Sequence, residues 1–276
     1  MIVARNMRID FTGAPLLFSP NKAFATIVNA SSVASSAFEG FLAKVMARAR
    51  DQLEASHPAL SREIDLFIAQ EGHHYRVHKI YNKRLYAAYP GARRFETELG
   101  DALRERMETR SLADNLAFST GFENFACVTA KYYFTRGLHH FDGPDQRIPT
   151  LWLWHAAEEY EHRTSCNRAM DAVGPGYRRR ISGLIDFMRL MVPWHARVVD
   201  YMLSVDRATM TEPERAESIA EKKFCDREML GYVLPRISRI FLPFYDPGRV
   251  GAPKALFEAL DRFERLALSP EPLAAG

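Results

Sequence analysis

The sequence predicts an all-α fold, in which a four-helix bundle is followed by additional C-terminal helices. Most of the chain carries apolar residues at spacings of three and four, which is the period of an amphipathic helix. Glycine and proline pairs separate these stretches and mark the expected helix ends. Few runs alternate polar residues with β-branched apolar ones, so no sheet is expected.

The size and composition of the chain fit one globular domain. Its 276 residues can bury a substantial core, and 47% hydrophobic with 26% charged residues is typical of soluble globular proteins. We expect a single helical domain over residues 1–276. Its parts are an irregular N-terminal arm (1–28), a four-helix core (29–175) and a C-terminal helical extension (176–268).

Charge, cysteine content and hydropathy argue against several classes of protein. A net charge of +3 without a basic run gives no sign of nucleic-acid binding. The three cysteines are far apart, which argues against a disulfide framework and fits a cytoplasmic location. The most apolar long window, residues 184–203, contains four charged residues, so no transmembrane segment is expected.

Four helices are expected in the core, at about residues 31–57, 60–88, 114–136 and 150–173. Proline or glycine ends the first, second and fourth of them. Either Ser111 or Asp114 is the expected N-cap of the third helix. Residues 95–107 are amphipathic and charged, and we expect them to be an approach segment that runs into the third helix.

Three more helices are expected in the C-terminal extension, at about residues 178–204, 212–241 and 253–266. Met188 and Met191 belong to an apolar surface of the first of these helices. Such a surface either covers the bundle or forms a contact between two subunits. We expect a homodimer.

An ordered series of glutamates and histidines runs through the four core helices. Glu71 and His74 are three residues apart, as are Glu159 and His162, so each pair projects from one helical face. Single glutamates precede each pair, at Glu39 and Glu123. Two such pairs and two single glutamates are what a carboxylate-bridged two-metal site in a four-helix bundle requires. Glu71 and Glu159 are the candidates for bridging two ions.

The helix at 150–173 offers further donors. His155 lies four residues before Glu159 and seven before His162, on one stripe of the helix, and would be a seventh ligand. Glu158 competes with Glu159, and helix geometry alone leaves both open. We favour Glu159 because it repeats the Glu-x-x-His spacing of the first pair.

Chance alone produces Glu-x-x-His pairs in a glutamate-rich helical chain, and Glu54 with His57 is such a pair at a helix end. The ordered series is stronger, because its acids lie among aromatic residues, where burial is costly unless the acid is paired or metal-bound. His78 is expected to be a hydrogen-bond partner of the ligands or a core residue, with Glu158 as a further partner or alternative ligand. Glu161 and Asp65 are further candidates to hydrogen-bond the ligand histidines.

Several motifs resemble those of the bacterial predicted metal-dependent hydrolase family, over about residues 30–245. They are Gln70-Glu71-Gly-His-His74 with Asn82, Phe122-Glu123, and the segment from Trp154 to Arg163. The His-x-x-x-Glu-x-x-His element is similar to that of di-iron arylamine N-oxygenases, which have a ferritin-like bundle. These resemblances imply a ferritin-like domain with seven ligands: Glu39, Glu71, His74, Glu123, His155, Glu159 and His162.

Two reactions are compatible with this ligand set. The first hypothesis is a di-iron enzyme that activates O₂ to oxidise or oxygenate a small hydrophobic substrate, because glutamate and histidine in a helical bundle suit iron. Its substrate pocket would be lined by Phe118, Phe122 and Trp152. The alternative is a two-metal hydrolase of an ester, amide or phosphate, as the family description suggests. Both need two metal ions, for which iron is favoured over manganese or zinc.

Overall fold

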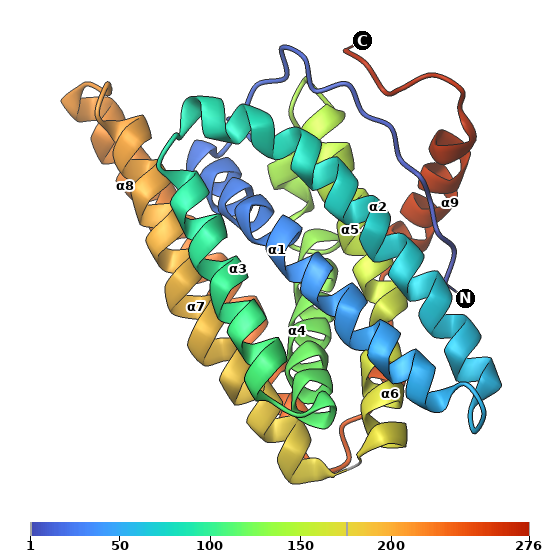
Figure 1. Cartoon of the computed structure of the whole chain (residues 1–276). Helices are drawn as coiled ribbons and strands as arrows, with labels where there is room; N and C mark the ends of the chain where they lie inside the picture. The colour runs from blue at the N-terminus through green and yellow to red at the C-terminus, as the bar shows by residue number, and fades with distance from the viewer. Residues whose placement is uncertain (1, 175, 276) are drawn as a thin grey trace.

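A computed structural model describes residues 2–174 and 176–275, and those residues form an all-helical protein (Figure 1). Three residues at which predicted ranges begin or end, 1, 175 and 276, lie outside the described residues. The first six helices are α1 (Lys22–Leu53), α2 (Pro58–Ala88), α3 (Ala92–Thr109), α4 (Leu112–Tyr133), α5 (Arg147–His162) and α6 (Ser165–Val173). The extension contains α7 (Tyr177–Arg207), α8 (Glu212–Ile240) and α9 (Lys254–Leu268). Short 3-10 turns lie at η1 (Leu138–Phe141) and η2 (Pro247–Arg249).

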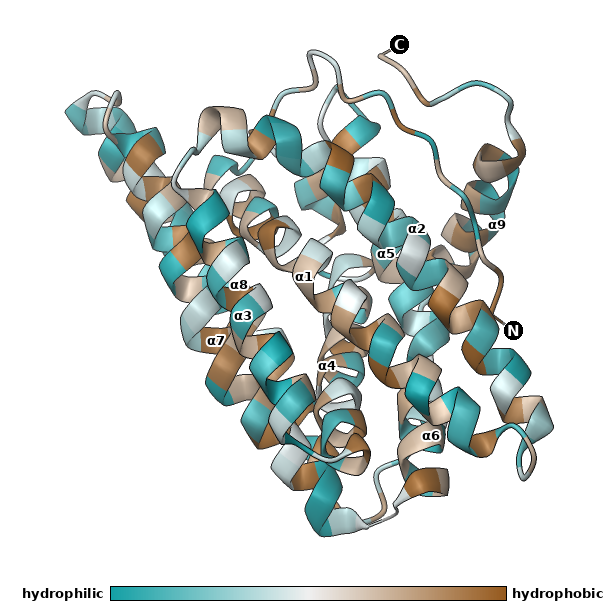
Figure 2. Ribbon diagram, viewed as in Figure 1, coloured by the Kyte–Doolittle hydropathy of each residue, from teal (hydrophilic) through white to brown (hydrophobic). Residues whose placement is uncertain are grey.

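The all-α prediction is confirmed. Within residues 2–174 and 176–275, β-pairing is limited to an isolated bridge between Ile9 and Leu273, which joins the two terminal segments. Figure 2 shows hydrophilic and hydrophobic residues side by side on each long helix, as expected of amphipathic helices that bury one face. None of the described helices combines the length and the apolar character needed to cross a membrane.

Two of the predicted helices have different bounds in the structure. The first helix begins at Lys22 instead of near residue 31, so the irregular arm is shorter than 1–28. The side chain of Asn21 caps this helix by accepting the backbone N–H of Phe24 at 2.9 Å. The predicted fourth helix is two helices, α5 and α6, separated at Arg163 and Thr164, where no glycine or proline marked a break.

The segment 95–107 is also different from the expectation. It belongs to a separate helix, α3, which ends at Thr109 before α4 begins. Ser111, one of the two candidate caps, accepts the backbone N–H of Asp114 at 3.1 Å and begins α4. In α3, Leu99 and Leu103 pack inward, and the charged face of the helix lies at the surface.

The bundle brings α1, α2, α4 and α5 around a common interior. In Figure 1, α1 and α2 run side by side, and α3, α7 and α8 line one flank. Residue contacts join α1 to α2, α4 to α5 and α4 to α7. Because all four core helices present one face to the same interior, side chains from each can meet there.

The α4–α7 contact depends on a glycine at the crossing. A Cβ atom at Gly183 would lie 2.1 Å from the carbonyl oxygen of Ala117, so the backbones approach too closely for a side chain. We expect Gly183→Ala to lower the free energy of unfolding by about 3 kcal/mol through overpacking. Urea denaturation of the variant measures this effect.

Gly100→Ala is the matched control for that prediction. Gly100 also lies inside a helix, but a Cβ there meets no atom within 4 Å. This change should be neutral or should stabilise the protein by up to about 1 kcal/mol, since alanine favours helices. Equal stability of the Gly183→Ala protein and the wild type would contradict the close α4–α7 crossing.

Candidate metal centre

The structure brings the seven predicted ligands together inside the bundle. Glu39 comes from α1, the Glu71–His74 pair from α2 and Glu123 from α4, while α5 supplies His155, Glu159 and His162. None of these residues is more than 7% exposed. Ligand side chains from four separate helices therefore point into one interior region.

The ligand atoms form two groups, in each of which the three atoms lie within 4.8 Å of one another. One group contains Glu39, His74 and His155, and the other contains Glu71, Glu159 and His162. Glu123 adjoins the second group, because its Oε1 lies 3.9 Å from Nδ1 of His162. Every predicted ligand thus belongs to a group or touches one.

Glu159 joins the two groups. Its Oε1 atom lies 3.0 Å from Nε2 of His155 and 3.7 Å from Nδ1 of His74, both of which belong to the first group. It is also a member of the second group. This position is the one that a carboxylate bridging two ions would take.

The unpaired polar atoms of the centre fit bound cations. Both carboxylate oxygens of Glu39, Glu71 and Glu159 are buried without a hydrogen-bond partner among the described residues, and so are Nδ1 of His74 and Nδ1 of His162. Buried polar atoms are normally hydrogen-bonded, so a cluster of unpaired ones indicates that an ion binds among them. Nδ1 of His162 lies 2.9 Å from Oε1 of Glu71 without hydrogen-bond alignment. Two donors that bind one ion at about 2.1 Å are separated by roughly this distance.

Outer hydrogen bonds fix which nitrogen of His74 and of His162 faces the centre. Nε2 of His74 bonds to Oε2 of Glu158 at 2.9 Å. Nε2 of His162 bonds to Oε1 of Gln70 at 2.7 Å. Each Nε2 therefore carries a proton, and Nδ1 is the nitrogen of each ring that faces the centre and would bind an ion.

A longer chain of hydrogen bonds orients His155. The hydroxyl of Ser32 donates to Oδ1 of Asn82 at 2.6 Å, so its oxygen accepts a hydrogen bond from Nδ1 of His78 at 2.8 Å. Nε2 of His78 then accepts from Nδ1 of His155 at 2.7 Å. The remaining nitrogen of His155, Nε2, faces Glu159 with its lone pair.

These contacts bear on the residues that the sequence left open. Glu158 hydrogen-bonds Nε2 of His74, on the side of the ring away from the centre, whereas Oε1 of Glu159 lies among the inward-facing nitrogens, which favours Glu159 as the ligand. His78 hydrogen-bonds His155. Glu161 accepts from Gln70 at 2.9 Å and from Arg5 instead of a ligand histidine, so it reaches His162 only through the amide of Gln70. The expectation for Asp65 was wrong, because its carboxylate is 54% exposed and pairs with Arg50 on the surface.

Comparison with known proteins gives a family. The model of the family described as "Predicted metal-dependent hydrolase" matches residues 3–251. The chain belongs to this family. Neither the search of curated proteins nor the search of solved structures found a match. Together, the family and the buried histidine and glutamate groups support metal dependence in this protein.

The family assignment confirms the resemblance to the metal-dependent hydrolases over nearly the whole chain. The ferritin-like assignment and the similarity to di-iron N-oxygenases stay predictions. The match includes the N-terminal arm from residue 3 and ends before α9.

Burial dominates the electrostatics of the centre in this metal-dependent hydrolase family member. Desolvation and the neighbouring carboxylates raise the pKa values of Glu39 and Glu123 well above their usual range. Although burial alone would lower it, the neighbouring Glu71 and Glu159 carboxylates raise the pKa of His162 to about 9. Burial lowers the pKa of His74, which therefore stays neutral. Without ions, protons bound to these side chains offset the repulsion between the closely spaced carboxylates.

The three predicted pocket residues lie in two places. The rings of Phe118 and Phe122 belong to an aromatic cluster with Phe38 and Phe187, with centroid distances of 4.4–6.0 Å. Trp152 lies instead beside two histidines, with its ring 5.0 Å from that of His78 and 5.9 Å from that of His155. Phe118 is fully buried, so it packs the core. The substrate pocket stays a prediction.

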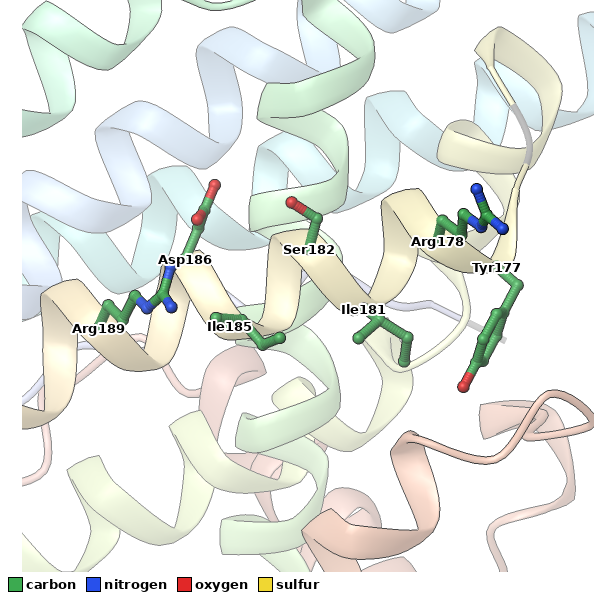
Figure 3. Close-up of a pocket in the computed structure, with 7 residues that line it drawn as sticks. All are labelled: Tyr177, Arg178, Ile181, Ser182, Ile185, Asp186 and Arg189. Carbon is green, nitrogen blue, oxygen red and sulfur yellow. The ribbon is translucent and has the colours of Figure 1, made fainter.

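Two surface hollows lie away from the ligand groups. One, of about 340 Å³, is lined by seven residues that all belong to α7, from Tyr177 to Arg189 (Figure 3). The other, of about 420 Å³, lies between α6, the start of α7 and η2, and includes Asn167 and Arg180. None of the seven predicted ligands lines either hollow.

A third histidine and glutamate group lies at η1 and α8. Glu228 accepts hydrogen bonds from Nε2 of His140 at 2.9 Å and from the hydroxyl of Tyr132 at 2.8 Å. Nδ1 of His139 donates to the carbonyl oxygen of Arg136 at 2.8 Å. These bonds tie η1 and α4 to α8.

Proposed function

We propose that this protein is a two-metal enzyme that hydrolyses a small organic substrate, with the ions held by the seven residues of the candidate centre. The observation that carries this proposal is the position of Glu159, which contacts both ligand groups. The family description favours hydrolysis. Two ions at such a site would supply an activated water and polarise the ester, amide or phosphate group to be cleaved.

The chain's own residues prepare the centre for that chemistry. Glu158 and Gln70 hold the imidazoles of His74 and His162 with their Nδ1 lone pairs turned inward. The apolar walls around the ligands, such as Phe67, whose ring lies 4.4 Å from that of His162, exclude bulk water. A dry site strengthens every electrostatic interaction within it.

O₂ activation by two iron ions is the second candidate, and the donor set favours it. Four glutamates and three histidines supply all the donors proposed, and aspartate contributes none. Mixed imidazole and carboxylate ligation suits iron, with manganese and zinc as alternatives. Under this proposal O₂ would be a co-substrate, and the small molecule would be oxidised or oxygenated.

One set of samples separates the two candidates. Metal-free protein is reloaded without oxygen with zinc, manganese or ferrous iron, and each form is tested against a panel of esters, amides and phosphate esters. Cleavage without oxygen is the result expected for the hydrolase. Oxygen uptake by the ferrous form, stoichiometric with protein and without anaerobic cleavage, would replace that proposal with the second candidate. Protein that binds no metal would contradict both.

The other functional expectations stay proposals as well. We propose that the substrate pocket is lined by Phe118, Phe122 and Trp152. We also propose that the protein is a homodimer and that it is cytoplasmic. Sedimentation velocity measures the oligomeric state. A monomer at micromolar concentration would contradict the dimer.

A further inference from the structure

The N-terminal arm reaches the hydrogen-bond partners of the candidate ligands. Arg5 lies on this arm, is 4% exposed and is more than 60 residues from any of the proposed ligands except Glu39. Its Nη1 atom donates to Oε1 of Glu158 at 3.0 Å and to Oε2 of Glu161 at 2.9 Å. A guanidinium buried with two carboxylates makes strong, charge-assisted hydrogen bonds.

One of these carboxylates leads to His74. Glu158 accepts from Arg5 through Oε1 and from Nε2 of His74 through Oε2. Its side chain is fully buried, so removal of Arg5 would leave it without a compensating charge. Without the ion pair that fixes Oε1, the carboxylate would be free to rotate away from Nε2 of His74, and the orientation of that imidazole would no longer be fixed.

The other carboxylate leads to His162. Glu161 accepts from Nε2 of Gln70 at 2.9 Å, and the carbonyl oxygen of Val3 accepts from the same Nε2 at 2.8 Å. These two acceptors determine that the amide oxygen of Gln70 faces His162. If the amide flipped, its NH₂ group would face Nε2 of His162, and the proton would move to Nδ1, where an ion must bind.

A single guanidinium therefore joins two paths that end at different ligand groups. Arg5–Glu158–His74 leads to the group with Glu39, and Arg5–Glu161–Gln70–His162 leads to the group with Glu71. The arm that carries Arg5 is itself fastened, because Arg76 donates to the carbonyl oxygen of Met7 at 2.7 Å. Backbone bonds of 2.9 Å between residues 8–10 and Leu273 hold the next part of the arm.

We propose that Arg5 is a positioning residue of the two-metal centre, which holds His74 and His162 in the tautomers that bind the ions. This inference rests on the proposed two-metal function. It assigns the N-terminal arm a role in assembling the centre, in addition to packing against α2 and α5. Arg5 acts only through Glu158, Glu161 and Gln70.

The test compares Arg5→Met with Arg5→Lys and Arg8→Met in metal binding. Methionine keeps the length of the side chain without its charge, while lysine keeps the charge. Arg8 lies on the same arm but bonds to the carbonyl oxygen of Ser269, away from the centre, so Arg8→Met controls for the arm itself. Zinc and manganese affinities are measured by competition with a chelator, and the tautomer of His74 in metal-free protein is measured by ¹H–¹⁵N NMR.

We expect Arg5→Met to weaken metal affinity by about 10–100-fold, as loss of a ligand's hydrogen-bond partner generally does. Arg5→Lys should recover most of that loss, and Arg8→Met should bind as the wild type does. The NMR spectrum should show the Nε2–H tautomer of His74 in the wild type and a mixture in Arg5→Met. Wild-type affinity and tautomer in Arg5→Met would overturn the inference.

Glu158→Gln keeps the test decisive if Arg5→Met does not fold. It probes the same path at its next member and should also weaken binding, because it removes the charged acceptor of His74. Wild-type affinity in Glu158→Gln would overturn the inference. Failure of the wild type to bind metal would instead refute the proposed function.

Discussion

Replacement of Glu159 by alanine should remove both metal ions from the protein. Glu159 is the residue whose carboxylate contacts both ligand groups, at 3.0 Å from His155 and 3.7 Å from His74, and it belongs to the group of Glu71 and His162. Loss of a non-bridging ligand weakens the binding of one ion, whereas loss of a bridging carboxylate removes a donor from both ions. Metal content after gel filtration measures the effect.

Glu54→Ala is the matched control. Glu54 also heads a Glu-x-x-His sequence, with His57, but both side chains are exposed at the end of α1. This variant should keep the wild-type metal content. If Glu159→Ala retained two ions with unchanged affinity, Glu159 would not join two metal sites.

Metal-free protein should lose stability as the pH rises from about 6.5 to about 9. The neighbouring Glu71 and Glu159 carboxylates raise the pKa of His162 from the ordinary 6.5 to about 9, against the effect of burial. A raised histidine pKa stabilises the folded state fully below the unfolded value, and that contribution disappears as the pH rises through the folded value. The expected loss in free energy of unfolding is roughly 3 kcal/mol over this window.

The acidic groups of the centre act in the same direction. The pKa values of Glu39 and Glu123 are raised, so the folded protein holds their protons more tightly than the unfolded chain and is destabilised as they ionise. Bound cations replace those protons, so metal-loaded protein should not lose stability in this window.

Urea denaturation in the presence of a chelator, at several pH values, measures this dependence. His162→Gln isolates the contribution of the imidazole and should flatten the curve between about pH 6.5 and about pH 9. If the stability of the metal-free protein stayed constant or increased across this window, His162 would not have the raised pKa that the neighbouring carboxylates give it.

Sequence spacing predicted the ligand face because the period of a helix is fixed. Glu71 with His74, and His155 with Glu159 and His162, needed only their separations along one helix to share a face. The all-α class followed in the same way from periodic apolar residues. Local patterns of this kind do not depend on the rest of the chain.

The choice between Glu158 and Glu159 depended on residues that local patterns cannot show. Both glutamates are compatible with the helix, and the outward turn of Glu158 follows from contacts with Arg5 and with His74 on α2. Arg5 lies in an irregular arm without periodicity, 153 residues from Glu158, so no sequence signal identified it. The break between α5 and α6 likewise lacked a glycine or proline.

Crystals of natively purified protein, measured at the absorption edges of iron, manganese and zinc, would show whether two ions bind in this interior. We expect two anomalous peaks on either side of the Glu159 carboxylate, one among Glu39, His74 and His155 and the other among Glu71, Glu123 and His162. The absence of ions from this interior, in protein whose metal content is two per chain, would contradict this expectation.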